Sequence, residues 1–183
     1  IAGYDFVEFV NENRARTRYQ TYGKGPRVTL LDLGVPQSVL KALTLRHMHV
    51  TVLPYDSSVE TILGTYPVGL IVSQSQKIED HVVDVLKQLQ GKLPILGLGM
   101  GAVILAKSFG VKTINECHFG GSHGVLNEIL GTVIMSVQNH DQGVDRDSLM
   151  AHDFNITHTE INDGGVEGFR HRFTPSVGIM FEA

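Results

Sequence analysis

Cysteine is almost absent from this chain, whose 183 residues include only Cys117. A single cysteine excludes an internal disulfide framework and is typical of a reducing compartment, so we expect an intracellular protein of the cytoplasm or the mitochondrial matrix. No apolar run approaches the ~18–20 residues of a membrane span, and the first residues show no signal-peptide pattern. The net charge of −4 predicts neither nucleic acid nor a membrane surface as a partner.

The remaining composition, 42% hydrophobic with 20 glycines, suits one compact domain. Residues 1–25 are mixed and polar and are predicted to be a lead-in or linker, and residues 26–183 to be the domain. From Arg27 on, strand-like apolar runs alternate four times with helix-like segments. The predicted strands are 27–34, 49–55, 68–74 and 93–98, and the predicted helices are 37–47, 57–66, 78–92 and 102–109.

This alternation is typical of a three-layer α/β fold with a mostly parallel central sheet, flavodoxin-like in outline. After Val111 the pattern changes to short strands, which predict an added and partly antiparallel extension. These short strands are 111–117, 131–138, 154–161, 166–173 and 176–183.

Three glycines follow the fourth predicted strand at every second position, Gly97, Gly99 and Gly101. They predict a tight strand-to-helix turn at the carboxyl end of a parallel strand, where open α/β sheets bind ligands. One interpretation is a dinucleotide fingerprint that ends at Ala102, with Glu116 as a ribose-binding acid. Another is a nucleophile elbow, Gly-x-Nuc-x-Gly, with position 99 at its apex. A plain tight turn without chemistry is the third.

Four segments, in order along the chain, resemble the motifs of one family. Residues 97–113, GLGMGAVILAKSFGVKT, are similar without a gap to an elbow that runs Gly-Ile-Cys-Leu-Gly-His-Gln. Residues 138–145, QNHDQGVD, resemble Gln-Asn-His-Gly-Phe-x-Val-Asp, and residues 157–168 resemble Thr-His-x-Ser-Leu-Asn-Asp-Gly. Residues 30–56 resemble the family's first strand, helix and second strand. The family is the class I glutamine amidotransferases, and within it the carbamoyl phosphate synthetase small subunit is most similar.

Members of this family hydrolyse glutamine with a Cys-His-Glu triad, and the ammonia passes to a large synthetase subunit that makes carbamoyl phosphate for pyrimidine and arginine synthesis. The resemblance therefore implies a synthetase large subunit or a fused synthetase domain as partner, and no cofactor. By resemblance, the positions of the substrate pocket are Ser73, Met100, Gly101, Val103, Asn139, Asp141 and Gln142.

The chain departs from the family at the residues that carry the chemistry. Gly99 stands where the family has its cysteine, and a hydrogen atom cannot replace a thiolate. The final His-Pro-Glu-Ala of the family becomes IMFEA, so either Met180 occupies the histidine position or Glu182 remains as an acid without its base. Val103 replaces the elbow glutamine. The oxyanion loop Ser-Asn-Gly-Pro-Gly-Asp-Pro reads SQSQKIE at 73–79, without the glycines whose backbone freedom it uses.

These departures predict a glutaminase-like domain that has lost its catalysis, binds glutamine weakly at most, and acts as a structural or regulatory partner of an ammonia-using synthetase subunit. Two alternatives stay open: an active glutamine amidotransferase that supplies ammonia, and a small-molecule or nucleotide-binding domain at the turn 97–101.

Other residue pairs offer little chemistry. Cys117 and His118 are neighbours on a predicted strand and should point to opposite faces, which favours a structural cysteine. Ser73 and Ser75 have no base placed beside them by the sequence. No spacing of cysteines and histidines matches a zinc template, so we expect no metal. The histidines considered are His118, His123, His140, His158 and His171.

Overall fold

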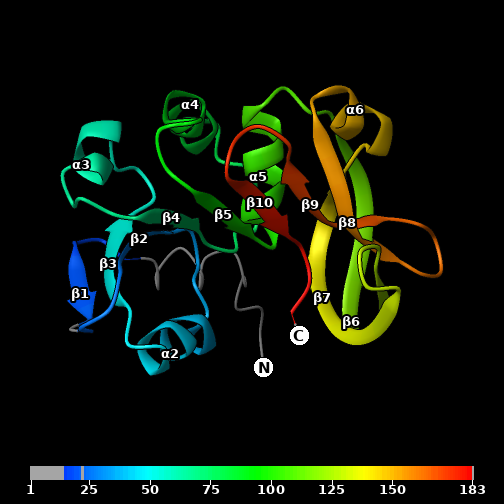
Figure 1. Cartoon of the computed structure of the whole chain (residues 1–183), viewed down its shortest axis with the longest axis horizontal. Coiled ribbons are helices and arrows are strands. Elements are labelled where there is room, and N and C mark those ends of the chain that lie inside the picture. Colours follow the sequence, from blue (N-terminus) through cyan, green and yellow to red (C-terminus); the bar gives the residue numbers. More distant parts are fainter. Residues whose placement is uncertain (1–14, 22, 183) are drawn as a thin grey trace, which may run out of the picture.

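The computed structural model describes residues 15–21 and 23–182. The described strands form a single sheet in the order β1-β3-β2-β4-β5-β10-β9-β8-β6-β7 (Figure 1). The strands are β1 (Tyr19–Thr21), β2 (Arg27–Asp32), β3 (His49–Pro54), β4 (Gly69–Val72), β5 (Ile95–Leu98), β6 (Thr113–Asn127), β7 (Thr132–Val144), β8 (Phe154–Glu160), β9 (Val166–His171) and β10 (Ser176–Ile179). The helices are α2 (Gln37–Leu45), α3 (Val59–Leu63), α4 (Asp80–Leu89), α5 (Met100–Ser108) and α6 (Arg146–Ala151). None of the described helices is both long and apolar enough to span a bilayer.

Five neighbouring strands, β3-β2-β4-β5-β10, run parallel. Numbered along the chain, their order is second, first, third, fourth and fifth, which is the flavodoxin-like order. In this order the direction of strand succession reverses between β2 and β4, and the cleft at that switch point is the usual ligand site. The predicted α/β class and mostly parallel sheet are confirmed.

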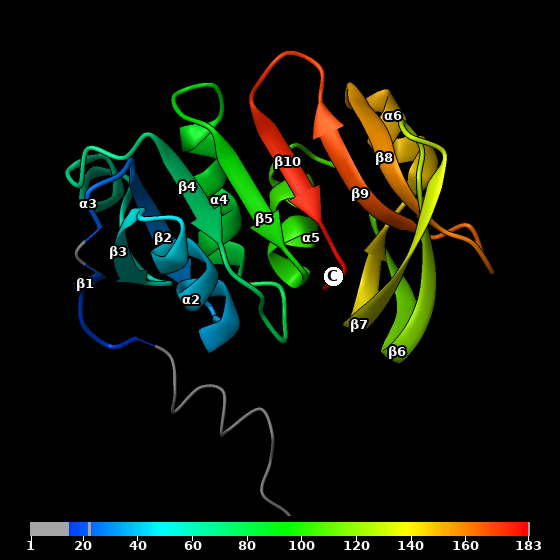
Figure 2. The same cartoon turned by 60° about the horizontal axis from the view of Figure 1, so that its bottom comes forward.

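Helices cover both faces of the parallel strands, which gives the three layers. Figure 2 shows α2 on one side of the sheet and α4 and α5 on the other. Successive strand residues point to opposite faces, and this is visible in β2. Leu30 packs with Val39 and Leu43 of α2, whereas Leu31 joins the cluster formed by α3, α4 and α5.

Local signals in the sequence set several helix ends. At the start of α3, the Ser58 hydroxyl accepts a hydrogen bond from the Thr61 N–H. Gly91 follows the end of α4 with φ +73°, and Gly110 follows the end of α5 with φ +91°. A glycine with positive φ is the common way to terminate a helix.

The chain after α5 builds the antiparallel extension on the right of Figure 1. The predicted short strands 111–117 and 131–138 belong to longer ones, because β6 and β7 pair as a hairpin of 15 and 13 residues. Register shifts in β6 between Asn115 and His118, and between Gly121 and His123, break the apolar alternation that would have revealed its length. The helix α6 was not predicted.

Two details at the sheet's other boundaries also differ from the sequence pattern. The last strand, β10, pairs antiparallel with β9 but parallel with β5, so it completes the parallel half of the sheet. Within the segment predicted as a lead-in, β1 pairs antiparallel with β3 and forms the edge of the sheet. The boundary at residue 26 stays a prediction.

Candidate functional site

The turn between β5 and α5 has the backbone of a nucleophile elbow. Gly99 has φ +54° and ψ −127° and directly precedes α5. Side-chain-bearing residues adopt such a conformation only at a cost of about 1–3 kcal/mol. The Gly99 N–H donates to the Ile179 carbonyl at 2.8 Å, which holds the turn against the end of β10. The predicted strand-to-helix turn is therefore present, with its apex at residue 99.

The two flanking glycines are required by close backbone packing. A β-carbon at Gly97 would lie 2.6 Å from the α-carbon of Ala102. A β-carbon at Gly101 would lie 2.4 Å from the Val72 carbonyl oxygen, on the neighbouring strand β4. These are approaches that a glycine permits and other residues do not.

The loop after β4 covers the apex. The Ser73 hydroxyl is fully buried and accepts from the Leu33 N–H at 2.8 Å, so it ties the end of β4 to the end of β2. The Gln74 side chain lies beside the empty nucleophile position, because a β-carbon at Gly99 would be 3.2 Å from Gln74 Cγ. None of the residues 73–79 has a positive φ, as expected once the glycines of this loop are gone.

A cavity surrounds this apex at the carboxyl ends of β2, β4 and β5, which is the switch point of the sheet. It has two adjoining lobes of about 340 and 460 Å³, and Pro36, Gln74, Asn139 and Glu182 line both. Among the described lining residues, the charged side chains are Asp141 and Glu182, and no lysine or arginine is present. The cavity therefore suits a small polar molecule that carries an amino group.

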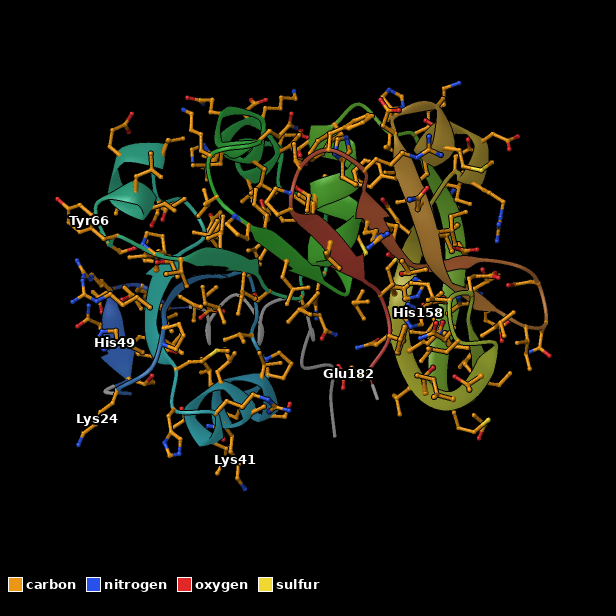
Figure 3. The ribbon with its side chains drawn as sticks, in the orientation of Figure 1. Lys24, Lys41, His49, Tyr66, His158 and Glu182 are labelled. Atoms are coloured by element: carbon orange, nitrogen blue, oxygen red, sulfur yellow. The ribbon has the colours of Figure 1, made fainter. Side chains whose placement is uncertain are left out.

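The segment after β10 brings no general base to the apex. Met180 is buried and its N–H donates to the Glu167 carbonyl at 2.9 Å. The backbone of Glu182 pairs with Val137 of β7, and its exposed carboxylate lies at the end of the segment that leaves β10 (Figure 3). Neither alignment considered for this segment places an imidazole beside Gly99.

The other proposed nucleophiles are also unsuited. Cys117 is exposed on β6 and lines neither lobe, so it is not a packed structural cysteine. Its neighbour His118 is buried, so the two side chains lie in different surroundings and do not form a pair at the cavity. The Ser75 hydroxyl donates to the Lys77 carbonyl at 2.7 Å. Among the described lining residues the single histidine is His140, and its Nδ1 donates to a backbone carbonyl.

The structure brings together most of the residues that the resemblance assigns to the pocket. Ser73, Met100, Asn139 and Asp141 line one lobe or both, and Gly101 packs behind the turn.

Two of the assigned residues lie elsewhere. Val103 is fully buried in the core between α5 and the extension and has no accessible surface. Gln142 does not line either lobe, and its carbonyl accepts from His140.

Sequence reasoning missed Gln74, which occupies the space next to the apex. It also missed Pro36 and Val35 as residues that line the cavity. The last two follow the carboxyl end of β2. The rule that ligands bind beyond the carboxyl ends of parallel strands could have found them.

The structure does not place Glu116 where the dinucleotide interpretation needs a ribose-binding acid. Glu116 does not line the cavity. It lies half-buried in the extension near His118, Asp163 and Glu167, and burial raises the pKa of its carboxyl group. With no cation among the described lining residues, a pyrophosphate would find only helix N–H groups at this turn.

The fold and the elbow define a class, and comparison with known proteins agrees with it. The family model for "Glutamine amidotransferase class-I" matches residues 29–181, so the chain belongs to the class I glutamine amidotransferases. The resemblance found in the sequence is thereby confirmed.

Within this family the chain is similar to proteins named carbamoyl phosphate synthase small chain. The one from Listeria monocytogenes is 34% identical over 180 residues, which are 96% of this chain and 50% of the relative. The one from Streptococcus pneumoniae is 36% identical over 177 residues, which are 94% of this chain and 49% of the relative. The chain thus spans about half the length of these curated relatives.

Two solved structures share the fold. A putative GMP synthase protein from Thermoplasma acidophilum has a TM-score of 0.68 at 23% identity, and the match covers 85% of this chain and 83% of that one. A glutamine amidotransferase from Thermotoga maritima has a TM-score of 0.67 at 16% identity, and the match covers 86% of this chain and 75% of that one.

Proposed function

We propose that this chain is a glutaminase-like domain of the carbamoyl phosphate synthase small-chain type that does not hydrolyse glutamine. In this proposal it serves as a structural or regulatory partner of a synthetase subunit that takes free ammonia to make carbamoyl phosphate. The observation that carries the proposal is Gly99, which stands at the apex of an intact elbow and has no side chain.

The size of the loss supports the proposal. Acyl transfer from glutamine needs a nucleophile that forms the acyl-enzyme. Removal of a triad nucleophile costs about 10⁶ in kcat, or about 8 kcal/mol of barrier, and loss of the other members adds little to it. The remaining acceleration comes from the oxyanion hole and binding, and the loop 73–79 that would contribute here has lost its glycines.

The cavity should also make weaker contacts with glutamine than the pocket of an active glutaminase does. Asp141 and Glu182 could pair with the amino group of glutamine, but no described cation lines the cavity to receive its carboxylate. The backbone N–H groups at the start of α5 remain as donors, since the first turn of a helix leaves them without intrahelical partners. Glutamine binding by this cavity is therefore expected to be weak.

An exposed apolar row on the sheet edge offers a surface for a synthetase partner. Val133, Met135 and Val137 of β7 are 52%, 65% and 49% exposed, and Phe119 of the paired strand β6 is 58% exposed. Contiguous exposed apolar surface of this kind commonly marks an interaction site. In the proposed complex the large synthetase chain covers this row.

Reconstitution tests the proposal. The chain is mixed with the large chain of a carbamoyl phosphate synthase, and carbamoyl phosphate is measured with either ammonium or glutamine as the nitrogen source. We expect association and synthesis from ammonium, with no synthesis from glutamine. Glutamine-dependent synthesis would contradict the loss of catalysis, and failure to associate would contradict the partnership.

The two alternatives give different results. An active amidotransferase that uses other residues would be labelled covalently by an electrophilic glutamine analogue, whereas the proposed domain would not. A small-molecule or nucleotide-binding domain would show a raised Tm with its ligand, because a molecule that binds the native state stabilises it. Glutamine and dinucleotides are the ligands to compare.

A further inference from the structure

The extension holds a buried cluster of two histidines and a glutamate that the proposed function does not use. His118 lies on β6, His140 lies opposite it on β7, and Glu167 lies on β9. Their exposed fractions are 5%, 2% and 0%. Ionisable side chains are rarely buried so completely unless they are paired or hold a metal ion.

The three side chains converge on one point. Glu167 Oε1 lies 2.9 Å from Nδ1 of His118 and 3.5 Å from Nε2 of His140, and one ligand atom from each residue lies within 4.8 Å of the others. Ligands that bind Zn²⁺ tetrahedrally at about 2.0–2.1 Å are about 3.3 Å apart. The two distances to Glu167 Oε1 are close to that value, and the distance between the two imidazole nitrogens does not exceed 4.8 Å.

Each histidine is oriented by a second group through its other nitrogen. Asp163 Oδ2 lies 2.7 Å from Nε2 of His118, and Nδ1 of His140 donates to the Gln142 carbonyl at 3.1 Å. Carboxylates and backbone carbonyls orient metal-binding imidazoles in this way. Because Nδ1 of His140 carries the proton, a neutral His140 presents the lone pair of Nε2 to Glu167.

The cluster also leaves two polar atoms unsatisfied. Nε2 of His140 and Oε2 of Glu167 are buried without a hydrogen-bond partner among the described residues. A doubly protonated His118 could satisfy Asp163 and Oε1 of Glu167, but it would leave both of these atoms unpaired. A buried lone pair that faces a carboxylate is costly, and a bound cation would remove that cost.

Glu116 stands beside the cluster in space that two glycines leave open. A β-carbon at Gly143 would lie 1.9 Å from Glu116 Oε2, and one at Gly165 would lie 2.4 Å from Oε1. Ligand atoms of Glu116, His118 and Asp163 also lie within 4.8 Å of one another. The Asp163 side chain is 52% exposed, so the cluster has a polar route to solvent.

We propose that His118, His140 and Glu167 form a binding site for a divalent transition-metal ion, with Zn²⁺ the ion that best matches two imidazoles and one carboxylate. Glu116 or a water molecule would complete the coordination. The site would cross-link β6, β7 and β9 and thereby stabilise the extension. The site adjoins the elbow cavity, because His140 also lines its second lobe, but it uses neither the apex at Gly99 nor the loop 73–79. It stands where the sequence spacing predicted no metal.

Zn²⁺ titration of the chelator-treated chain tests this proposal by calorimetry. We expect one saturable site per chain, a higher Tm with Zn²⁺ that chelator reverses, and visible absorption of a tetrahedral site when Co²⁺ replaces Zn²⁺. His140→Gln should weaken Zn²⁺ binding by at least about 100-fold, and Asp163→Asn by about 10- to 100-fold. His81→Gln, on the exposed face of α4, is the matched control and should bind as the unsubstituted chain does.

Two results would overturn the proposal: no saturable one-to-one phase in the unsubstituted chain, or equal Zn²⁺ affinity for His140→Gln and His81→Gln. If His140→Gln does not fold, Asp163→Asn decides, because its side chain is half exposed and its replacement removes no buried volume. Unchanged affinity in Asp163→Asn would then overturn the proposed orientation of His118 by that carboxylate and the site with it.

Discussion

The conformation of Gly99 makes a quantitative prediction about stability. The residue has φ +54° and ψ −127°, and a β-carbon added there would lie 3.2 Å from Gln74 Cγ. Gly99→Ala therefore requires a backbone conformation that costs about 1–3 kcal/mol and a small displacement of Gln74. We expect a loss of about 2 kcal/mol in the free energy of unfolding, which lowers Tm by about 4–8 °C for a chain of this size.

Alanine variants at two other glycines distinguish the conformational cost of a positive φ from the cost of the steric contact with Gln74. Gly131 has φ +65° and open space where a β-carbon would stand, and Gly121 has neither a positive φ nor a contact. Gly131→Ala should therefore show the conformational cost alone, and Gly121→Ala should be close to neutral. The double variant Gly99→Ala/Gln74→Ala should recover the part of the stability loss that comes from the contact between the new β-carbon and Gln74.

Denaturant unfolding followed by circular dichroism measures all four variants. If Gly99→Ala is as stable as Gly121→Ala, the elbow is not strained at its apex and the reasoning is refuted. Gly99→Cys should lose as much stability as Gly99→Ala, and it should not gain glutaminase activity, because none of the described residues that line the lobe around Gly99 is a histidine.

The remaining predictions concern pH, packing and the partner surface. Nδ1 of His171 accepts hydrogen bonds from two backbone N–H groups, and burial lowers the pKa of this imidazole. The contribution of His171 to the free energy of unfolding should therefore be complete above the unfolded-state pKa of about 6.5 and should decrease as the pH drops below it. Denaturation at a series of pH values should show a smaller decrease for His171→Asn. Gly101→Ala should unfold at much lower denaturant concentration than the unsubstituted chain, because its β-carbon would lie 2.4 Å from a backbone oxygen. Met135→Lys should weaken association with the large synthetase chain in a sedimentation assay. Met150→Lys is the control, because Met150 is also exposed but lies on α6, and it should leave the association unchanged.

Much of the fold could be predicted because parallel strands are buried on both faces. The apolar runs at 27–34 and 68–74 stand out for this reason, and α3 between them begins at a clear cap, Ser58. The pairing of β10 with β5 could not be predicted, since a strand's own residues do not identify its neighbour. The lengths of β6 and β7 were also hidden, because one face of that hairpin is open and its register shifts.

The site was predictable where backbone geometry imposes a residue type. Gly97 and Gly101 admit no β-carbon, and their spacing alone marked the turn. Gln74 was missed because its role depends on where its side chain falls in space. His118 and His140 are brought together by strand register and Glu167 by a third strand, so no local spacing could reveal their cluster.

Glutamate release by the purified chain, alone and with the large synthetase chain, tests the central claim most directly. A typical enzyme turns over at about 10 s⁻¹, and a loss of about 10⁶ predicts a rate near 10⁻⁵ s⁻¹. The account predicts no release above that level at saturating glutamine. Release that saturates with glutamine, co-purifies with the chain and exceeds this rate by several orders of magnitude would contradict it.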